Sequence, residues 1–444
     1  MKDLSPPDTG FHYMTRRHFL WTVSLSSLGL AMGCAVDPVT GQKTLMLVSE
    51  NQEIQMDRQY SPSQFSSDYG KTKDSALNSY LSEVGRKMIP HTHRPGMPYN
   101  FQVVNATYVN AYAFPGGTIA ATRGILLKMD SEAELAALLG HEMGHVNARH
   151  TAEQMSKGQV TSLVLGLGTA LAGSKYADVA GQLGQIGAGM LLASYSRDNE
   201  READALGNRY MVQAGYSTQG FVGLMEMLNS MSKSKPGYSD ILFSTHPMSD
   251  ERYSAAVQSA QTTYAGTKNF PLNRERYMDQ TAGLRRIKDA IESMQKGESA
   301  MGKKNYDQAE SLLQSALRQA PGDYAGLAMM SKCLLAQKKY DQAEQYAENA
   351  KRAYPGEAQA YHLSGFAKLQ MKKYGPAYWE FEACDKAIPG NPTLTFFKGY
   401  CQEGMGGRKQ AADLYNTYLQ SVQKGDYAQH AYTRLSEWGY IRKK

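Results

Sequence analysis

The feature that most constrains this fold is a 34-residue period in the last third of the chain. Tyrosine, alanine, proline and small-residue columns all repeat with this step. They are Tyr306, Tyr340 and Tyr374; Ala309, Ala343, Ala377 and Ala411; Pro321, Pro355 and Pro389; and Gly297, Ser331, Gly365 and Gly399. Small residues at fixed positions let paired helices approach closely, and a proline closes each repeat because it cannot continue a helix. Residues 284–440 are therefore predicted to form about four helical pairs.

This pattern resembles the tetratricopeptide (TPR) repeat. The resemblance implies an α-solenoid, a stack of helix pairs whose concave face binds other proteins. It is specific for the fold and uninformative about the ligand. The array is therefore expected to hold a substrate or a partner.

The composition of the 444 residues is that of a globular protein with two or three domains. A hydrophobic content of 42% and a charged content of 20% argue against extensive disorder. The net charge of +6 is spread over 48 basic and 42 acidic residues without a long basic run, which argues against a nucleic-acid partner. Four cysteines are too few for a disulfide scaffold. Cys384 and Cys401 fall on neighbouring repeat helices, so a disulfide between them is a further hypothesis, which would leave Cys333 unpaired.

The first 33 residues are predicted to be an export signal. Arg16 and Arg17 precede an apolar stretch, residues 21–32, that is too short to span a bilayer. The run around the two arginines resembles a twin-arginine signal, and Leu30 to Cys34 resembles a bacterial lipobox whose leucine is one place too far from the cysteine. We therefore expect the mature protein to work outside the cytoplasm, with a lipid on Cys34. The alternative is an ordinary secretory signal with a chance cysteine.

Residues 34–265 are expected to form a first domain of mixed α+β character in a mainly α chain. Helical periodicity dominates, with one strand-turn-strand signal over residues 101–127 that breaks at the Pro-Gly-Gly of residues 115–117. Residues 160–190, rich in Gly, Ala and Leu, are a flap over the cleft, a membrane-touching loop or a buried helical hairpin. Residues 266–283 are predicted to be a linker.

The segment from Ser131 to His145 carries the chemistry. Ser131 followed by Glu134 is a capping pattern, so a helix is expected to begin there. His141 and His145 lie one turn apart, a spacing at which both imidazoles reach one zinc ion, with Glu142 beside the open position. The alternative is a surface helix with two solvated histidines. Because the stretch is nearly free of charge, we predict instead that it is buried.

A third metal ligand is expected near residue 200. Glu200 and Asp204 are four residues apart and share one face of a predicted helix. This spacing allows Glu200 to bind the metal while Asp204 accepts a hydrogen bond from the far nitrogen of a ligating histidine. The alternative is a helix of surface ion pairs, because Arg197, Arg201 and Glu202 are present as well.

These motifs resemble the HtpX and CAAX prenyl protease type of zinc metallopeptidase, in which H-E-x-x-H is followed by E-x-x-x-D. Further stretches that carry the resemblance are Asp37 to Gly41, Asn110 to Gly117, Ser196-Arg197, and Thr245-His246-Pro247 with Arg252. The resemblance covers residues 37–255 and implies a zincin-like (gluzincin) α+β domain with one Zn²⁺ per chain. It makes His141, His145 and Glu200 the metal ligands, Glu142 the general base, and His246 a fourth ligand in some members.

Three residues are candidates for stabilising the tetrahedral oxyanion: His246, Arg252 and Tyr195. If His246 binds the metal at rest, it would instead displace the catalytic water and hold the enzyme latent. Asn110, Ala111 and Ala113 are predicted to lie on an edge strand that pairs with an extended substrate. A plain hairpin is an equal alternative on the residues alone.

The chain is similar to the soluble periplasmic, BepA-like branch of that family. The similarity implies a zinc-dependent endopeptidase of the bacterial cell envelope that degrades misfolded or stalled proteins. Its TPR face would recruit these substrates or the outer-membrane assembly machinery, and lipidated Cys34 would anchor the chain to the inner face of the outer membrane. The alternative is a chaperone or scaffold for outer-membrane protein assembly whose protease site is largely latent.

Overall fold

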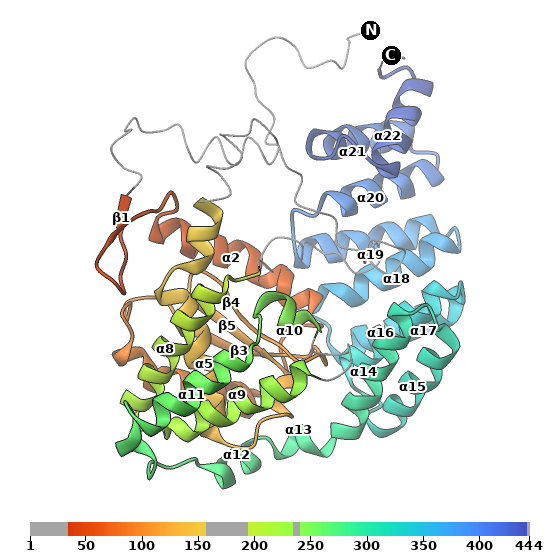
Figure 1. Cartoon of the computed structure of the whole chain (residues 1–444). Helices are drawn as coiled ribbons and strands as arrows, with labels where there is room; N and C mark the ends of the chain where they lie inside the picture. Colours follow the sequence, from red (N-terminus) through yellow and green to blue (C-terminus); the bar gives the residue numbers. More distant parts are fainter. Residues whose placement is uncertain (1–33, 157–193, 234–239, 442–444) are drawn as a thin grey trace. The chain divides into compact units, whose positions relative to one another are not determined.

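The computed structural model describes residues 34–156, 194–233 and 240–441. The predicted export signal and the segment 160–190 lie outside the described residues. The chain divides into two units, one ending at Met329 and the other beginning at Met330 (Figure 1). Among the described residues, no helix combines the length and the apolar composition needed to cross a membrane.

The first unit holds a short hairpin, a small sheet and the helices around that sheet (Figure 1). Its elements are β1 (Cys34–Val36), β2 (Lys43–Leu45), α2 (Glu50–Ser67), α3 (Ser75–Met88), η1 (Ile89–His91), β3 (Asn100–Val104), β4 (Ala111–Ala113), β5 (Thr118–Thr122), α4 (Arg123–Leu126), α5 (Glu132–Asn147), α8 (Arg197–Gln213), α9 (Thr218–Ser232), α10 (Asp240–Thr245), α11 (Asp250–Gln261), η2 (Ala265–Thr267), α12 (Arg274–Gln280), α13 (Ala282–Arg286), α14 (Lys288–Gly302) and α15 (Tyr306–Gln319). Helix α16 (Tyr324–Ala336) crosses the division between the units.

The three-stranded sheet has the strand order β3-β5-β4. β3 runs parallel to β5, with Asn100 opposite Thr118, whereas β4 runs antiparallel to β5, with Ala111 opposite Ala121. Gly117 turns the chain between β4 and β5 with a φ of +101°, a conformation that glycine adopts at little cost. The predicted strand-turn-strand is therefore confirmed, and β4 lies at one edge of this sheet.

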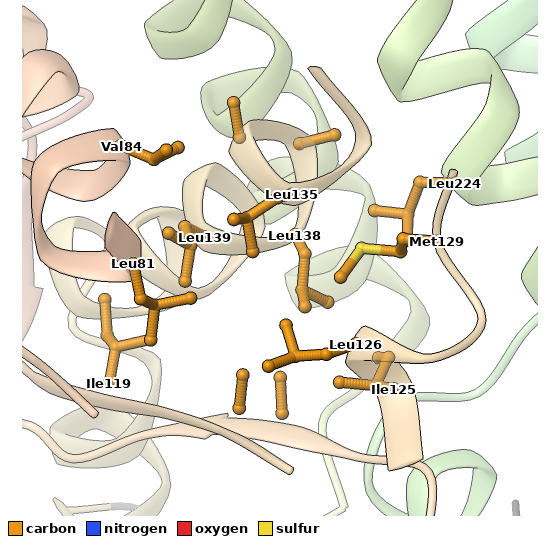
Figure 2. Packing of buried hydrophobic residues seen from close by; sticks show 14 of the residues in the cluster. Leu81, Val84, Ile119, Ile125, Leu126, Met129, Leu135, Leu138, Leu139 and Leu224 are labelled. Atoms are coloured by element: carbon orange, nitrogen blue, oxygen red, sulfur yellow. The ribbon is translucent and has the colours of Figure 1, made fainter. Parts of the chain in front are cut away.

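Helix α5 lies at the centre of the first unit's core. Ser131 caps it by accepting a hydrogen bond from the N–H of Glu134 at 3.2 Å, as the capping pattern predicts. Every residue of α5 except Glu134 is buried, so the expected buried helix is confirmed and the alternative of a solvated surface helix is wrong. Figure 2 shows the leucines of α5 in an apolar cluster with side chains of α3, β5, α4 and α9.

Helices α5 and α8 touch backbone to backbone through small residues. A Cβ added at Gly207 of α8 would lie 2.6 Å from the backbone nitrogen of His141, and one added at Gly140 would lie 2.8 Å from the carbonyl oxygen of Gly207. One turn further along α5, a Cβ at Gly144 would lie 2.7 Å from the carbonyl oxygen of Ala203. No larger side chain fits along this contact without moving the helices apart. The contact brings the face of α8 that carries Glu200 against the two histidines of α5.

The second unit continues the helical repeat. Its further elements are α17 (Tyr340–Ala353), α18 (Ala358–Gln370), α19 (Tyr374–Ala387), α20 (Pro392–Gly404), α21 (Arg408–Ser421) and α22 (Asp426–Glu437). Helices α15, α17 and α19 each begin at a tyrosine of the 34-residue column, and the lysine two residues earlier has a φ of +60° in all three repeats. The residues of the alanine column are buried completely. The predicted α-solenoid of TPR repeats is confirmed.

The hypothesis of a disulfide between Cys384 and Cys401 is wrong. The two residues lie on α19 and α20, and their sulfur atoms are not bonded to each other. Both side chains are buried completely, and burial raises the pKa of each thiol to about 12. They act as small apolar side chains in the helix interface, as buried cysteines commonly do.

Residues 266–283, the expected linker, carry helix α12 and pack on the first unit. Tyr277 of α12 is buried completely, and its hydroxyl donates a hydrogen bond of 2.7 Å to the carbonyl oxygen of Leu126. Its neighbour Arg276 pairs with the buried carboxylate of Glu132 at the start of α5. This segment therefore holds the beginning of helix α5 in place. The exact domain boundaries stay a prediction.

The first repeat helices also belong to the first unit. Gln295 of α14 donates a hydrogen bond to the carbonyl oxygen of Thr107, in the loop that leads into β4. Arg123, directly after β5, pairs with Asp323 at the start of α16, and both side chains are only 6% exposed. Two buried contacts thus tie the first repeat helices to the open end of the β4-β5 hairpin, through the loop before β4 and the residue after β5.

The close contact of α5 and α8 predicts that Gly207→Ala destabilises the protein by about 1–3 kcal/mol, because the new methyl group would overlap the backbone of His141. Urea unfolding followed by circular dichroism measures the change. The matched control is Gly302→Ala at the end of α14, where an added Cβ meets no atom within 4 Å. Unchanged or higher stability is expected there. A Gly207→Ala protein as stable as the control would contradict the backbone contact.

Candidate metal centre

Three elements bring the predicted ligands to one point. His141 and His145 project from α5, Glu200 comes from the first turn of α8, and His246 directly follows α10. One ligand atom of each lies within 4.8 Å of the others, and all four residues are buried. His246 Nδ1 lies 3.0 Å from Glu200 Oε1, and the Nε2 atoms of the two α5 histidines are 3.1 Å apart.

Asp204 fixes the proton of His141. The Nδ1 atom of His141 lies 2.9 Å from Asp204 Oδ1, and both groups are buried. Because a carboxylate only accepts hydrogen bonds, Nδ1 is the donor and Nε2 carries the lone pair. That lone pair faces the other ligand atoms. The structure thus places Asp204 where the spacing of α8 predicts it.

Arg252, at the start of α11, joins the two carboxylates of α8. Its Nε and Nη2 each donate to an oxygen of Asp204 at 2.7 Å, and its Nη1 lies 2.6 Å from Glu200 Oε2. Burial alone raises the pKa of both carboxyl groups, yet the net shift is downward: His246 and the other histidines outweigh burial at Glu200, and Arg252 does so at Asp204. Nη1 also donates to the carbonyl oxygen of Pro247, next to His246. The guanidinium therefore positions ligands; that it also contacts substrate stays a prediction.

Glu142 lies beside the ligand cluster with an unused oxygen. Its Oε1 is 3.8 Å from His246 Nε2, and its Oε2 is buried without a hydrogen-bond partner among the described residues. Burial is the largest cause of a raised pKa at this carboxyl group. A buried carboxylate with a free oxygen and a raised pKa is suited to take up a proton.

Tyr195 covers one face of His145. The two rings are stacked, with centroids 3.9 Å apart, and the Tyr195 hydroxyl lies 3.1 Å from the hydroxyl of Thr151. Its backbone N–H donates to the carbonyl oxygen of Thr245, the residue before His246. Of the three oxyanion candidates, His246 has its Nε2 atom 3.8 Å from Glu142 Oε1, and which of them would stabilise the oxyanion stays a prediction.

His150 and Glu202 belong to the site, and the sequence analysis missed their role. His150 Nδ1 lies 2.9 Å from His145 Nδ1, and His150 Nε2 lies 3.2 Å from Glu202 Oε2. A spacing of five residues does not place His150 on the same helical face as His145. Helix α5 ends at Asn147, and Arg149, with a φ of +57°, turns the chain so that His150 comes back beside His145. Only this break in the helix makes the contact, so periodicity gave no signal for it.

The edge strand lies next to the site. A narrow hollow, which has no room for a water molecule, is lined both by the end of β4 and by α5. Its lining residues are Glu53, Ala113, Phe114, Pro115, His145, Val146, Arg149 and Thr151. Ala111 and Ala113 are in β4, whereas Asn110 precedes it and accepts a hydrogen bond of 3.0 Å from the Thr122 N–H. Substrate pairing with this strand stays a prediction.

The cluster fits a metal ion by the chemistry of its donors. Burial lowers the pKa of His145 well below its usual value, so that imidazole is neutral, the form that binds metals. Three imidazole nitrogens and one carboxylate oxygen form a donor set that suits zinc and related transition metals. The hydrogen bond from His141 to Asp204 is the outer contact that a ligating histidine normally makes.

The comparisons with known proteins agree with this geometry. Residues 75–260 match the model of Peptidase family M48, and residues 300–365 match that of a tetratricopeptide repeat. The chain is 28% identical over 285 residues to the beta-barrel assembly-enhancing protease of Yersinia pestis, covering 58% of each chain. It is 26% identical over 315 residues to the protein of that name in Escherichia coli (strain K12), covering 64% of this chain and 63% of that protein.

A third relative is named as a metalloprotease. Metalloprotease YcaL of Escherichia coli (strain K12) is 32% identical over 181 residues, which are 41% of this chain and 69% of that protein. The chain spans about three fifths of the length of the two assembly-enhancing proteases. The metal-ligand cluster and these matches lead to one conclusion: the chain belongs to peptidase family M48, with TPR repeats after its peptidase domain.

Proposed function

We propose that this protein is a zinc-dependent endopeptidase of the bacterial cell envelope that degrades misfolded or stalled proteins. The observation that carries the proposal is the convergence of His141, His145, Glu200 and His246 beside the unpartnered oxygen of Glu142. A purely structural metal site has no use for a buried carboxylate base next to the metal. The match to peptidase family M48 supports the same chemistry.

The residues of the metal centre have different roles in peptide hydrolysis. His141, His145 and Glu200 hold zinc, which when bound supplies a Lewis acid and makes a water molecule more acidic. Glu142 takes up the water proton at its free Oε2 and delivers it to the leaving amine. Asp204 and Arg252 keep the ligands in place: Asp204 accepts a buried hydrogen bond from His141, and Arg252 forms a buried ion pair with Glu200.

The substrate binds as an extended strand. β4 is at the sheet edge, and its last residue, Ala113, lines the narrow hollow together with His145. A peptide that pairs with this edge would lie beside the metal ligands, held mainly by backbone hydrogen bonds. Such binding selects for unfolded segments over particular side chains, which suits a quality-control protease.

His246 holds the resting enzyme latent. It adds a fourth protein ligand to the cluster, and a metal site with four protein ligands has no place left for water. The residue lies in the short connection between α10 and α11, outside the two helices that carry the other three ligands. Displacement of His246 by a bound substrate would then open the site.

The remaining biological role rests on similarity. The name that the Yersinia pestis and Escherichia coli relatives share, beta-barrel assembly-enhancing protease, supports a place in outer-membrane protein assembly. We propose that lipidated Cys34 anchors the chain to the inner face of the outer membrane. The TPR face would recruit misassembled proteins or the assembly machinery. The four-ligand cluster also favours a second candidate, a chaperone or scaffold whose peptidase site stays latent.

Glu142→Gln tests the enzymatic role. We expect casein cleavage by the purified mature chain to fall roughly 10²- to 10⁴-fold, because the amide cannot take up a proton. The zinc content, measured by mass spectrometry, should stay at one ion per chain. Glu226→Gln, an exposed glutamate of α9, is the control and should cleave like the wild type. If Glu142→Gln fully replaces the wild type in cells, the scaffold is the correct function.

His246→Ala tests latency. We expect basal casein cleavage to rise roughly 10-fold or more. A minor open state is typically populated at up to about 10%, and removing the His246 imidazole would make the open state the dominant one. His91→Ala at the end of η1 is the control for loss of an imidazole. The double variant His246→Ala/Glu142→Gln should be inactive, which ties the gain to the same site. Unchanged or lower activity with full zinc content would exclude the latch.

A further inference from the structure

We propose that His150 and Glu202 are positioning residues that fix the proton of His145 and so aim its lone pair at the metal. The inference rests on the proposed function in one respect: His145 must be a metal ligand. It concerns a row of three hydrogen-bonded side chains that runs from buried His145 through buried His150 to the partly exposed carboxylate of Glu202.

The distances define the chain. The Nδ1 atoms of His145 and His150 are 2.9 Å apart, and the side chains are 1% and 2% exposed. At the other end, His150 Nε2 lies 3.2 Å from Glu202 Oε2, and the Glu202 side chain is 35% exposed. The chain therefore leads from the buried ligand to a group in contact with solvent.

Only one arrangement of protons satisfies both contacts. His145 needs the lone pair of Nε2 for the metal, so its proton is on Nδ1 and is donated to His150. His150 Nδ1 must then accept, which places the His150 proton on Nε2. The carboxylate of Glu202 accepts that second hydrogen bond. In this arrangement each hydrogen-bond donor faces an acceptor.

The two histidines of α5 thus have different hydrogen-bond partners at Nδ1. His141 donates directly to Asp204, which shares a helical face with Glu200. Glu202 is two residues from Glu200 and points away from that face, so it reaches His145 only through the additional imidazole of His150. Tyr195 stacks on the His145 ring, and its hydroxyl is within hydrogen-bond distance of Thr151. The orientation of His145 about its ring axis therefore depends on His150.

A matched pair of variants isolates the hydrogen bond. In His150→Asn, the Oδ1 atom occupies the place of Nδ1 and still accepts from His145, whereas His150→Leu has the same branched shape and no acceptor. We expect the dissociation constant for Zn²⁺, measured by competition with a chromophoric chelator, to rise about 10- to 100-fold in His150→Leu. His150→Asn should stay within about 3-fold of the wild type, since it keeps the accepting atom.

Cobalt gives a second readout of the ligand itself. The visible absorption of the Co²⁺-loaded protein reports the ligand field, so His150→Leu should shift or weaken these bands and His150→Asn should preserve them. Equal affinities and spectra for the two variants would overturn the proposal. A wild-type chain that binds neither ion would instead refute the metal site and with it the proposed function.

Glu202 provides a test that does not depend on a buried substitution. Glu202→Met removes the last acceptor from a side chain that is partly exposed, and Glu226→Met makes the same change on α9. We expect Glu202→Met to bind Zn²⁺ several-fold more weakly than Glu226→Met, with the same thermal midpoint for the two apo proteins. If His150→Leu does not fold, this comparison decides, and equal zinc affinities would overturn the proposal.

Discussion

The direct backbone contact between α5 and α8 is the constraint on which the site depends. Glycines 140, 144 and 207 leave no side chain between the helices, so a methyl group at residue 207 would meet the backbone of His141 itself. Only at this separation do the short side chains of Glu200 and Asp204 reach the imidazoles of α5. The two helices therefore act as one rigid body, which is the condition for precise metal coordination.

Such close packing buries charged side chains away from water, and neighbouring side chains of opposite charge neutralise them. Two carboxylates of α8 are buried together, and their mutual repulsion is offset by Arg252 with three short contacts. A similar balance holds the end of α5, where buried Glu53 pairs with Arg94 and Arg149. Removing one member of such a group is costly because the others stay buried without a partner.

Much of this organisation follows from regular spacing in the sequence. The 34-residue columns predict the repeat helices, the Ser131 cap predicts the start of α5, and four-residue steps predict which side chains share a face. The contact between His145 and His150 could not be predicted in this way. It depends on the left-handed conformation of Arg149, which ends the helical periodicity. The Cys384–Cys401 disulfide failed for a related reason: neighbouring helices do not specify how two side chains point.

The hydrogen bond from Gln295 to Thr107 and the ion pair of Arg123 with Asp323 tie the first repeat helices to the open end of the β4-β5 hairpin. The peptidase fold and these first repeat helices are therefore joined by buried contacts as well as by the chain itself. Replacing the chain from residue 284 onward with a foreign repeat domain would remove these supports from the β4-β5 pair.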